Sequence, residues 1–584
     1  MTAGERLRRA DRWLILGSGL ALSLPALTVS AFNDDILQRL LLEGRIPEYG
    51  NAWWRLYDFT PPSLPATKAT ELGFFPLFTH PELSLRFFRP LTSASLTIDH
   101  LLFGRAMLPA HVHSVAWFAA LAGLVTALYA RWFTRRVALV SSLVFAVAGL
   151  HAMPTAWLAS RHTLLAATFA ALALWAQARR REDDWTPGVW LAPFAVAASL
   201  LASESGLGAV VFSTLYELTA NRSLRERGRA AAPFVGLGLG YLLVYAAAGF
   251  GAQGSSAYVS PFSDPAGFAL AALRRVPVLA GELFGGVPAL LALTPRAESM
   301  LALIGLVVLG LVGAVLFVPR GHATASELGR ARWLAAAALL AVVPGVGTIL
   351  GGRLLPLAMI GAAAVVGLAL SASWRALRSK AEPRRWWLAL PFAALVIGHF
   401  VLSPLVRVGL PLEFARIAGA QRSIAHSADL GACVDGGRAY LLTGADPTLS
   451  LYAAPGFAYF TPEALRTERF RVLSMAPAAQ RLTRVGPASF ELEITGPRPV
   501  NQFERLYRPA HAPLEAGFAR TTEELTVRVL EAEGGLFRKL RLDIAGDSSS
   551  TCALVWRDGK LQPLPWPELG QTAVIPYERG PMGF

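Results

Sequence analysis

Two adjacent carboxylates, Asp34 and Asp35, follow directly after the first apolar segment of the chain. An acidic pair at a membrane surface is costly unless it is solvated or used, so the pair is a candidate functional site. A carboxylate beside a hydroxyl group can take its proton as a general base. Because neighbouring residues on a helix diverge by about 100°, we expect only one of the two carboxylates to reach an acceptor hydroxyl. We favour Asp34 as the base, with Asp35 orienting it or holding a metal ion. The alternative is an ordinary helix end with two solvated acids.

Basic and imidazole side chains recur in later segments that we expect on the same side of the membrane. Arginine presents a fixed fork of donors that suits a phosphate leaving group. The candidates for binding such a group are Arg89, Arg161 and Arg353, with His151 and His162 as secondary donors and Glu204 in the same set. Each of them alone is more often an interface anchor or a helix cap, but their convergence on one face argues for a site.

Metal-binding motifs are weak in this sequence. Cys433 and Cys552 are its only cysteines and have no CxxC spacing, and there is no HExxH motif, so nothing supports zinc. A divalent cation beside Asp34 and Asp35 stays open. The two cysteines could form a disulfide in an oxidising compartment, and two separate buried thiols are the alternative.

Composition identifies the broad class. Of the 584 residues, 54% are hydrophobic and only 16% are charged, whereas soluble domains carry about a quarter charged residues. The sequence therefore predicts an integral membrane protein whose partner is the lipid bilayer. The formal charge of +14 would suit nucleic acid, but the arginines form short clusters between apolar runs, so we expect no nucleic-acid partner.

Apolar runs long enough to cross a bilayer, about 17–25 residues, predict about eleven transmembrane helices. They lie near residues 13–31, 113–131, 136–151, 163–178, 187–202, 204–219, 231–250, 299–318, 331–350, 354–371 and 386–406. We expect the interrupted segment 265–294 to be interfacial or re-entrant. The first run also resembles a signal peptide, but it is longer than the usual apolar core of one, so an uncleaved helix is expected.

The distribution of arginine predicts the orientation. Clusters within 6–12, 131–136, 179–181, 222–229, 320–332 and 375–385 all fall on one side if the N-terminus is cytoplasmic. The C-terminus and a long first outer loop, about residues 33–112, then lie outside the membrane. We expect a bacterial inner membrane protein.

The composition changes after about residue 406. Short runs of alternating polarity, separated by Gly, Pro and Asp turns, occur at 438–442, 470–473, 489–494, 525–530 and 540–544. The sequence thus predicts two domains, a transmembrane domain over 1–406 and an extracytoplasmic, mostly antiparallel β domain over 407–584. The β domain would recognise the acceptor or, as we favour, cap the membrane part.

Several short motifs, in order, resemble those of the integral-membrane GT-C glycosyltransferases. They are Asp34-Asp35 after the first helix, Arg89-Pro90-Leu91-Thr92, the His151…Trp157…Arg161 spacing, Glu204-Ser205-Gly206 and Arg353-Leu354-Leu355-Pro356. The resemblance covers roughly residues 13–406 and is to the O-mannosyltransferase-like branch, without its tetratricopeptide repeats. Three positions depart from the pattern: Met153 and Thr163 replace acids, and Ser203 replaces a lysine.

The resemblance implies that an acidic residue at the start of the first outer loop is the catalytic base and that the donor is a polyprenyl-phosphate sugar. The expected reaction moves a sugar, with mannose as a candidate, to a hydroxyl of a protein or glycan acceptor on the outer face. A non-catalytic scaffold or degenerate relative is one alternative, and a transporter of lipid-linked sugars is another. A transporter is expected to place polar residues at the middle of the membrane, whereas here they lie at the outer ends of the spans.

Overall fold

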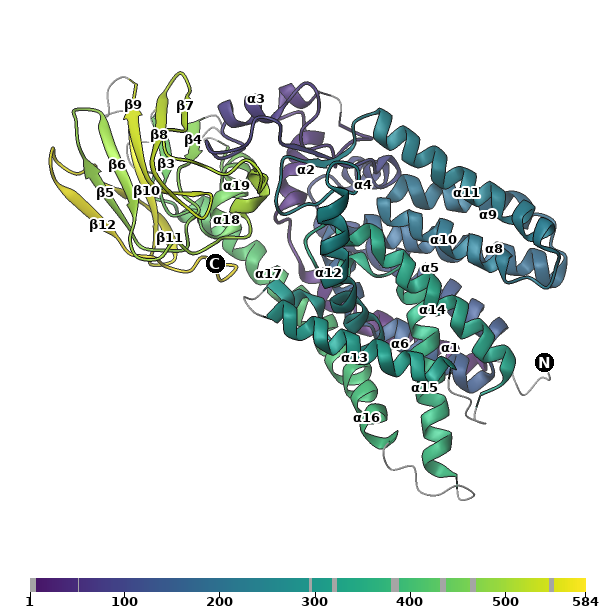
Figure 1. Cartoon of the computed structure of the whole chain (residues 1–584). Coiled ribbons are helices and arrows are strands. Elements are labelled where there is room, and N and C mark those ends of the chain that lie inside the picture. The colour runs from purple at the N-terminus through teal and green to yellow at the C-terminus, as the bar shows by residue number, and fades with distance from the viewer. Residues whose placement is uncertain are drawn as a thin grey trace.

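The protein is described by a computed structural model covering residues 7–50, 52–293, 297–317, 323–379, 388–430, 437–462, 469–545 and 551–584 (Figure 1). Helices form the N-terminal two thirds and strands most of the remainder, so the predicted fold class, a polytopic helical protein with a C-terminal β domain, is confirmed. The helices are α1 (Arg9–Ala21), α2 (Asp34–Leu42), α3 (Ala66–Glu71), α4 (Pro90–Phe103), α5 (Met107–Trp132), α6 (Arg135–Val147), α7 (Ala152–Ala156), α8 (His162–Asp183), α9 (Gly188–Ala202), α10 (Leu207–Leu218), α11 (Leu224–Ala247), α12 (Pro265–Gly285), α13 (Ala297–Phe317), α14 (Ala325–Val346), α15 (Met359–Arg378), α16 (Ala389–Ile397), α17 (Ser403–Ser427), α18 (Pro447–Ser450) and α19 (Ala453–Phe460).

Seven helical segments of the described residues are long and apolar enough to cross a membrane, so the chain is an integral membrane protein. They are α5, Leu158–Asp183 with α8, α11, α13, α14, α15 and the continuous run Ala389–Ser427. An eighth is added if α6 and the segment Gly149–Ala156, bent by 43°, count as one span. The helices α1, α9 and α10 at other expected spans are shorter, and the count of eleven stays a prediction.

The first outer loop contains short elements instead of long helices. After α2 and α3, the strand β1 (Ser84–Arg86) pairs antiparallel with β2 (Gly251–Gln253) from the α11–α12 connection. Arg86 of β1 forms an ion pair with the buried Asp58, with 2.9 Å between Nε and Oδ1. These pairings tie the loop to a distant connection, so the first outer loop has a fixed structure.

The C-terminal β domain contains two sheets. Its strands are β3 (Arg438–Leu441), β4 (Phe470–Val472), β5 (Gln480–Arg484), β6 (Ser489–Ile494), β7 (Ala519–Thr521), β8 (Leu525–Glu533), β9 (Leu536–Ile544), β10 (Thr551–Arg557), β11 (Lys560–Leu564) and β12 (Thr572–Ile575). The larger sheet, of order β12-β5-β6-β9-β8-β7, is antiparallel throughout, whereas in the sheet β11-β10-β3-β4 the strand β3 runs parallel to both its neighbours. The β10–β11 hairpin turns at Asp558 and Gly559, both with positive φ, as a two-residue Asp-Gly turn requires.

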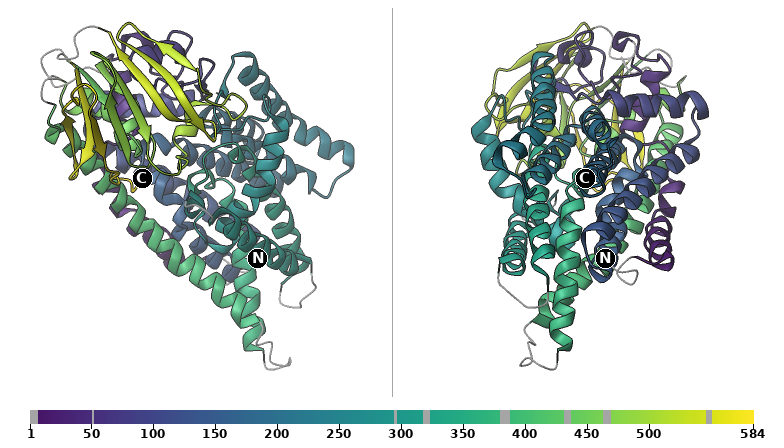
Figure 2. Two further views of the ribbon diagram at one scale, coloured as in Figure 1. Left: turned by 60° about the vertical axis from the view of Figure 1, so that its left-hand side comes forward. Right: turned by 90° about the vertical axis from the view of Figure 1, so that its right-hand side faces the viewer.

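The helix α17 connects the two parts of the molecule. It runs through the expected boundary between residues 406 and 407, ends at Ser427 and leads toward the sheets (Figures 1 and 2). Apolar side chains of the first outer loop, among them Phe78 and Leu85, share one core with the β domain. The outer loop therefore packs against the β domain as well as against the helices.

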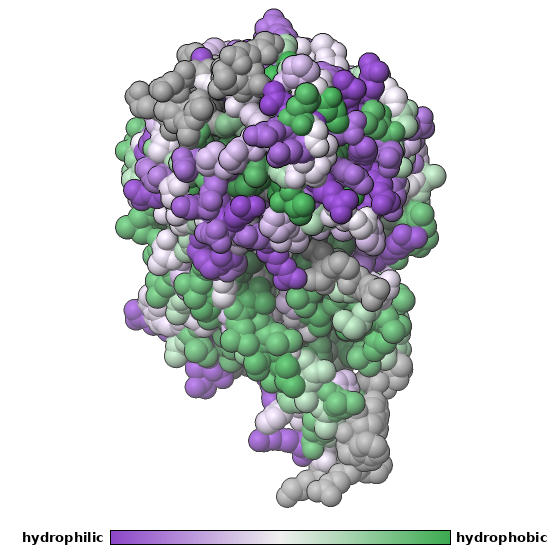
Figure 3. Space-filling model, turned by 90° about the vertical axis from the view of Figure 1, so that its left-hand side faces the viewer, coloured by the Kyte–Doolittle hydropathy of each residue, from purple (hydrophilic) through white to green (hydrophobic). Residues whose placement is uncertain are grey.

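The surface changes character along the long axis of the molecule. In Figure 3 polar side chains cover most of the upper part, and apolar side chains dominate the lower part of this face. Exposed large apolar residues of α11, α13 and α16, such as Leu243, Leu303 and Leu390, fit a lipid-facing surface. Of the two cysteines, Cys552 is disulfide-bonded and buried in β10, and Cys433 lies outside the described residues.

Candidate functional site

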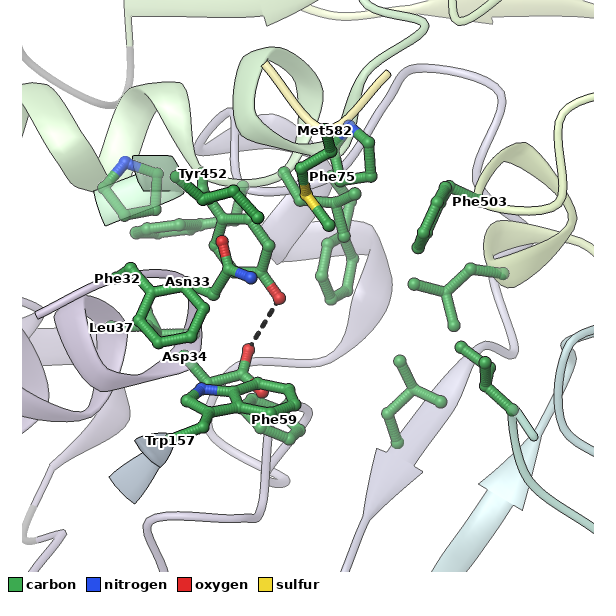
Figure 4. A pocket seen from close by; sticks show the side chains of 18 of the residues that line it. Phe32, Asn33, Asp34, Leu37, Phe59, Phe75, Trp157, Tyr452, Phe503 and Met582 are labelled. Carbon is green, nitrogen blue, oxygen red and sulfur yellow. Dashed lines mark hydrogen bonds between the residues drawn. The ribbon is translucent and has the colours of Figure 1, made fainter. Parts of the chain in front are cut away.

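A cavity of about 470 Å³ lies where the helices, the first outer loop and the C-terminal domain meet. Its wall is largely aromatic and aliphatic, and the charged side chains among the residues that line it are Asp34, Arg353 and Glu413. Figure 4 shows Tyr452 beside Asp34, with Trp157, Phe503 and Met582 among the other labelled side chains that line the cavity. Such a volume suits a small ligand or part of a larger one, and its few polar groups are placed to orient that ligand.

A polar clamp sets the position of Asp34. Asn33, just before α2, has φ of +51°, a conformation that asparagine tolerates better than most residues. Its backbone N–H donates to Oε1 of Gln421 at 3.0 Å, and Gln421 Nε2 donates to Asn33 Oδ1 at 2.7 Å. Because Gln421 lies on α17, this exchange fixes the start of α2 against the helix that leads to the β domain.

Asp34 is the first residue of α2, and its carboxylate reaches the cavity. The hydroxyl group of Tyr452 donates a hydrogen bond to Oδ1 of Asp34 at 2.8 Å (Figure 4). Burial raises the pKa of Asp34 above its ordinary value, while Tyr452 and the positive charges of Arg353 and Arg89 act in the opposite direction. A carboxylate with a raised pKa is suited to accepting a proton near neutral pH.

Asp35 points away from the residues that hold Asp34. Its Oδ1 accepts the backbone N–H of Ala159 at 2.8 Å, and the side chain is buried. Burial raises the pKa of Asp35 to about 7. The divergence expected for neighbouring helical residues is thus present, and it places Asp35 as a link between α2 and the segment just before α8.

Arg353 lies in a 3-10 turn, Gly352–Leu354, between α14 and α15, and lines the cavity. Within the described part of the chain it makes one weak hydrogen bond, from Nη2 to the carbonyl oxygen of Ile349 at 3.3 Å. Burial lowers the pKa of Arg353, and the charge of Asp34 acts against this shift. The guanidinium therefore keeps donors available for an anion in the cavity.

Arg89 and Glu204 form an ion pair beside the cavity, with 2.8 Å between Nε and Oε2. The guanidinium of Arg89 also lies over the rings of Tyr57 and Phe87, at 4.9 and 4.8 Å from their centroids. The pair joins the start of α4 to the turn between α9 and α10, where Ser203 caps the short helix that contains Glu204. The structure thus brings together two predicted site residues, Arg89 and Glu204, which form an ion pair with each other.

Arg161 is engaged in a different buried network. It pairs with Asp99, with 2.6 Å between Nη1 and Oδ2, and its other donors reach Ser114 and the carbonyl oxygen of Ala110. Its side chain has no exposed surface. The geometry assigns Arg161 to holding the segment before α8 against α4 and α5, which leaves it little capacity to bind a phosphate.

The stability of Arg161→Met tests this assignment. Removing one partner of a buried pair leaves an uncompensated charge, so we expect a loss of about 3–5 kcal/mol in folding stability. Arg131→Met is the control, because Arg131 pairs with Glu182 and Asp183 at the surface, where a pair contributes about 0–1 kcal/mol. Thermal unfolding of both variants in detergent measures the difference. An Arg161→Met protein as stable as the control but defective in donor binding would assign the residue to the phosphate instead.

The two predicted histidines lie outside the group of residues that lines the cavity. His151 is buried between Phe118 and Phe145, at 5.1 and 4.8 Å between ring centroids. His162 Nδ1 lies 2.9 Å from Ser203 Oγ. In the described ranges, no three His, Cys, Asp or Glu side chains come together to hold a metal ion.

Several cavity residues have no local signal in the sequence. Tyr452 and Tyr507 come from the C-terminal domain, and Tyr258 comes from the α11–α12 connection. Tyr452 is 418 residues from the carboxylate that it contacts. A single tyrosine at a helix boundary is too common to be identified from sequence.

No protein-family model and no curated protein matches the chain. Among solved structures, the chain is similar to the oligosaccharyltransferase of Archaeoglobus fulgidus, at 11% identity and a TM-score of 0.38 over 79% of this chain and 64% of that one. ArnT from Cupriavidus metallidurans, solved bound to undecaprenyl phosphate, is 12% identical with a TM-score of 0.40, over 91% and 98% of the two chains. The arabinofuranosyltransferase AftD from Mycobacteria is 16% identical with a TM-score of 0.35, over 81% and 32%.

These three proteins are GT-C glycosyltransferases, the group that the sequence motifs resemble. The chain spans less than two thirds of the length of the archaeal enzyme and about a third of AftD. The O-mannosyltransferase-like subtype and the lack of tetratricopeptide repeats stay predictions.

Proposed function

We propose that the chain is a membrane glycosyltransferase that moves a sugar from a polyprenyl-phosphate donor to an acceptor hydroxyl. The observation that carries this proposal is the cavity, in which the Asp34 carboxylate and the Arg353 guanidinium are the charged groups apart from Glu413. Glu413 pairs with Arg416, and both side chains are about half exposed, so it belongs to the rim. A base and a phosphate-binding cation in one apolar chamber is the combination that this transfer needs.

The reaction uses the two groups in one step. Asp34 takes the proton of the acceptor hydroxyl group while the oxygen of that hydroxyl group attacks the anomeric carbon of the sugar. The bond between that carbon and the phosphate oxygen breaks, and the phosphate leaves with the electron pair. Arg353 stabilises the negative charge on the phosphate. A single displacement of this kind inverts the anomeric centre.

The apolar wall fits the lipid part of the donor. Leu410, Phe414 and Ile417 of α17 line the cavity on the side of the membrane part. A prenyl chain entering along this helix would bring its phosphate toward Arg353. Mannose as the sugar and a protein or glycan as the acceptor are the finer parts of the proposal, and they rest on the sequence resemblance.

A transfer assay tests the proposed function. The full chain in lipid vesicles is supplied with polyprenyl-phosphate mannose and, separately, with other polyprenyl-phosphate sugars, and with peptide or glycan acceptors. We expect acceptor-dependent release of polyprenyl phosphate. Binding of the donor without any release would favour a non-catalytic scaffold, and movement of the intact donor across the vesicle bilayer would favour a transporter.

The proposal places the chain in a bacterial inner membrane, with a cytoplasmic N-terminus and the C-terminal domain outside. The arginine clusters support this orientation, because positive loops stay in the cytoplasm. Alkaline phosphatase, which is active only outside, should be active when fused at Gly254 or Gly496 and inactive at Arg227 or Arg378. An active fusion at Arg378 would place the loop after α15 outside the cytoplasm and contradict the proposed topology.

A further inference from the structure

The C-terminal domain supplies part of the wall around Asp34. Its residues Pro447, Leu451, Tyr452, Phe503 and Tyr507 line the same cavity as Asp34 and Arg353. Tyr452 directly precedes α19, and α19 packs against both α2 and α17. The domain therefore does more than cover the membrane part, because one of its side chains reaches the carboxylate proposed as the base.

We propose that Tyr452 is a positioning residue that holds the Asp34 carboxylate in the orientation and the ionised state that a base requires. This inference rests on the proposed function. The hydrogen bond occupies Oδ1 of Asp34 at 2.8 Å, and no described residue donates a hydrogen bond to Oδ2. The second oxygen is thus left to accept the proton of the acceptor hydroxyl.

Rigid elements on both sides hold the pair together. On one side, Asn33 and Gln421 fix the start of α2. On the other, the buried Asp446 accepts hydrogen bonds from the backbone N–H of Thr448 at 2.9 Å and from that of Met582 at 2.7 Å, which fixes the start of α18. A side chain carried by supported helices holds its partner more accurately than one on a free loop.

Several charges besides the Tyr452 hydrogen bond affect the pKa of Asp34. Arg353 and Arg89 favour the ionised carboxylate, whereas the charge of Asp35 on α2 opposes it. The other titratable residues that line the cavity are Tyr49, Tyr258, Tyr507 and Glu413. Burial raises the pKa of the Tyr452 phenol well above its ordinary value, so the hydroxyl stays a donor throughout the working pH range. A donor to the charged form lowers the pKa of a carboxyl group, and its loss raises it.

Tyr452→Phe removes the hydroxyl group and keeps the ring. We expect the acid limb of the turnover–pH profile to move upward by about one pH unit, because a hydrogen bond to a charged group contributes on that scale. Turnover below the new limb should fall about tenfold, and the KM for the donor should not change. Tyr459→Phe is the matched control, since Tyr459 belongs to the same helix, α19, and does not line the cavity.

A second measurement needs no turnover. Dicyclohexylcarbodiimide reacts with protonated carboxyl groups in apolar surroundings, so its labelling of Asp34 against pH reports the protonation of that group. Fragment masses that separate Asp34 from Asp35 locate the label in the full-length protein. We expect the labelling midpoint to rise in Tyr452→Phe and to stay at the wild-type value in Tyr459→Phe.

The outcomes separate this inference from the proposed function. An unchanged midpoint in a folded Tyr452→Phe protein would overturn the positioning role, even if the wild type transfers sugar. A raised midpoint in a chain that transfers no sugar would uphold the coupling and overturn the function. Asp34→Asn with and without Tyr452→Phe gives a further check, because equal residual turnover is expected and an additional loss would show that Tyr452 acts through another group.

Discussion

Asp34→Asn is expected to reduce turnover by about 10²-fold or more. Asparagine has nearly the same shape as aspartate, so it can still accept the hydrogen bond of Tyr452 while losing the capacity to take a proton. Folding and donor binding should therefore persist, and kcat should carry the loss. Initial rates of sugar release in vesicles, with donor binding measured separately, distinguish the two quantities.

The dependence on pH follows from the environment of Asp34. Burial raises its pKa, so the carboxyl group is protonated at pH values where an exposed aspartate is already ionised. Turnover needs the ionised form, and it should therefore be lost as the pH falls through a value above the ordinary 3.8. An acid limb at or below 3.8 would contradict the assignment of Asp34 as the base.

Asp35→Asn gives the comparison within the same helix. Its Oδ1 would still accept the N–H of Ala159, and the substitution removes a buried charge, so we expect a loss of tenfold or less. A larger loss than in Asp34→Asn would exchange the roles of the two acids. Wild-type turnover in both variants would refute the catalytic interpretation and favour the scaffold.

Arg353→Ala should raise the KM for the donor by about 10- to 100-fold, because hydrogen bonds to a charged group contribute about 1.5–3 kcal/mol. The guanidinium lines the cavity with little engagement elsewhere, so its loss should remove phosphate binding without disturbing the fold. Titration of the donor against the initial rate measures the change. Arg353→Lys should recover part of the affinity, since it restores the charge and not the planar fork.

Arg45→Ala is the control for net charge. Arg45 is exposed just after α2, and its one hydrogen bond to a described residue is long, 3.5 Å to the carbonyl oxygen of Ala458. Removing it takes one positive charge from the same region, so the KM should stay at the wild-type value. Equal effects of the two substitutions would indicate general electrostatic attraction rather than a phosphate site at Arg353.

Local patterns in the sequence were sufficient for the broad architecture. Long apolar runs predicted membrane helices because a bilayer selects for hydrophobic length, and seven such segments are present among the described residues. Alternating polarity predicted strands at 438–442, 489–494 and 525–530, and β3, β6 and β8 occur there. These signals can be read locally because the polarity of each short segment matches the lipid or water that surrounds it.

The divergence of the acid pair was also a local matter. Asp34 and Asp35 open a helix, and the helical rotation alone sends their carboxylates toward different partners. Which of them would face a cavity could not be read from that rotation. It depends on Gln421 and Tyr452, 388 and 418 residues away from their partners along the chain.

Only the tertiary structure distinguished the roles of the candidate arginines. Arg89, Arg161 and Arg353 are chemically equal in sequence, and each was a candidate for binding phosphate. Folding placed Asp99 against Arg161 and Glu204 against Arg89, and it left Arg353 in the cavity. Residue type and short-range pattern thus predicted a membrane protein with an acidic pair just after its first apolar segment. Packing between distant segments decided that Arg89 and Arg161 form ion pairs and that Arg353 lines the cavity.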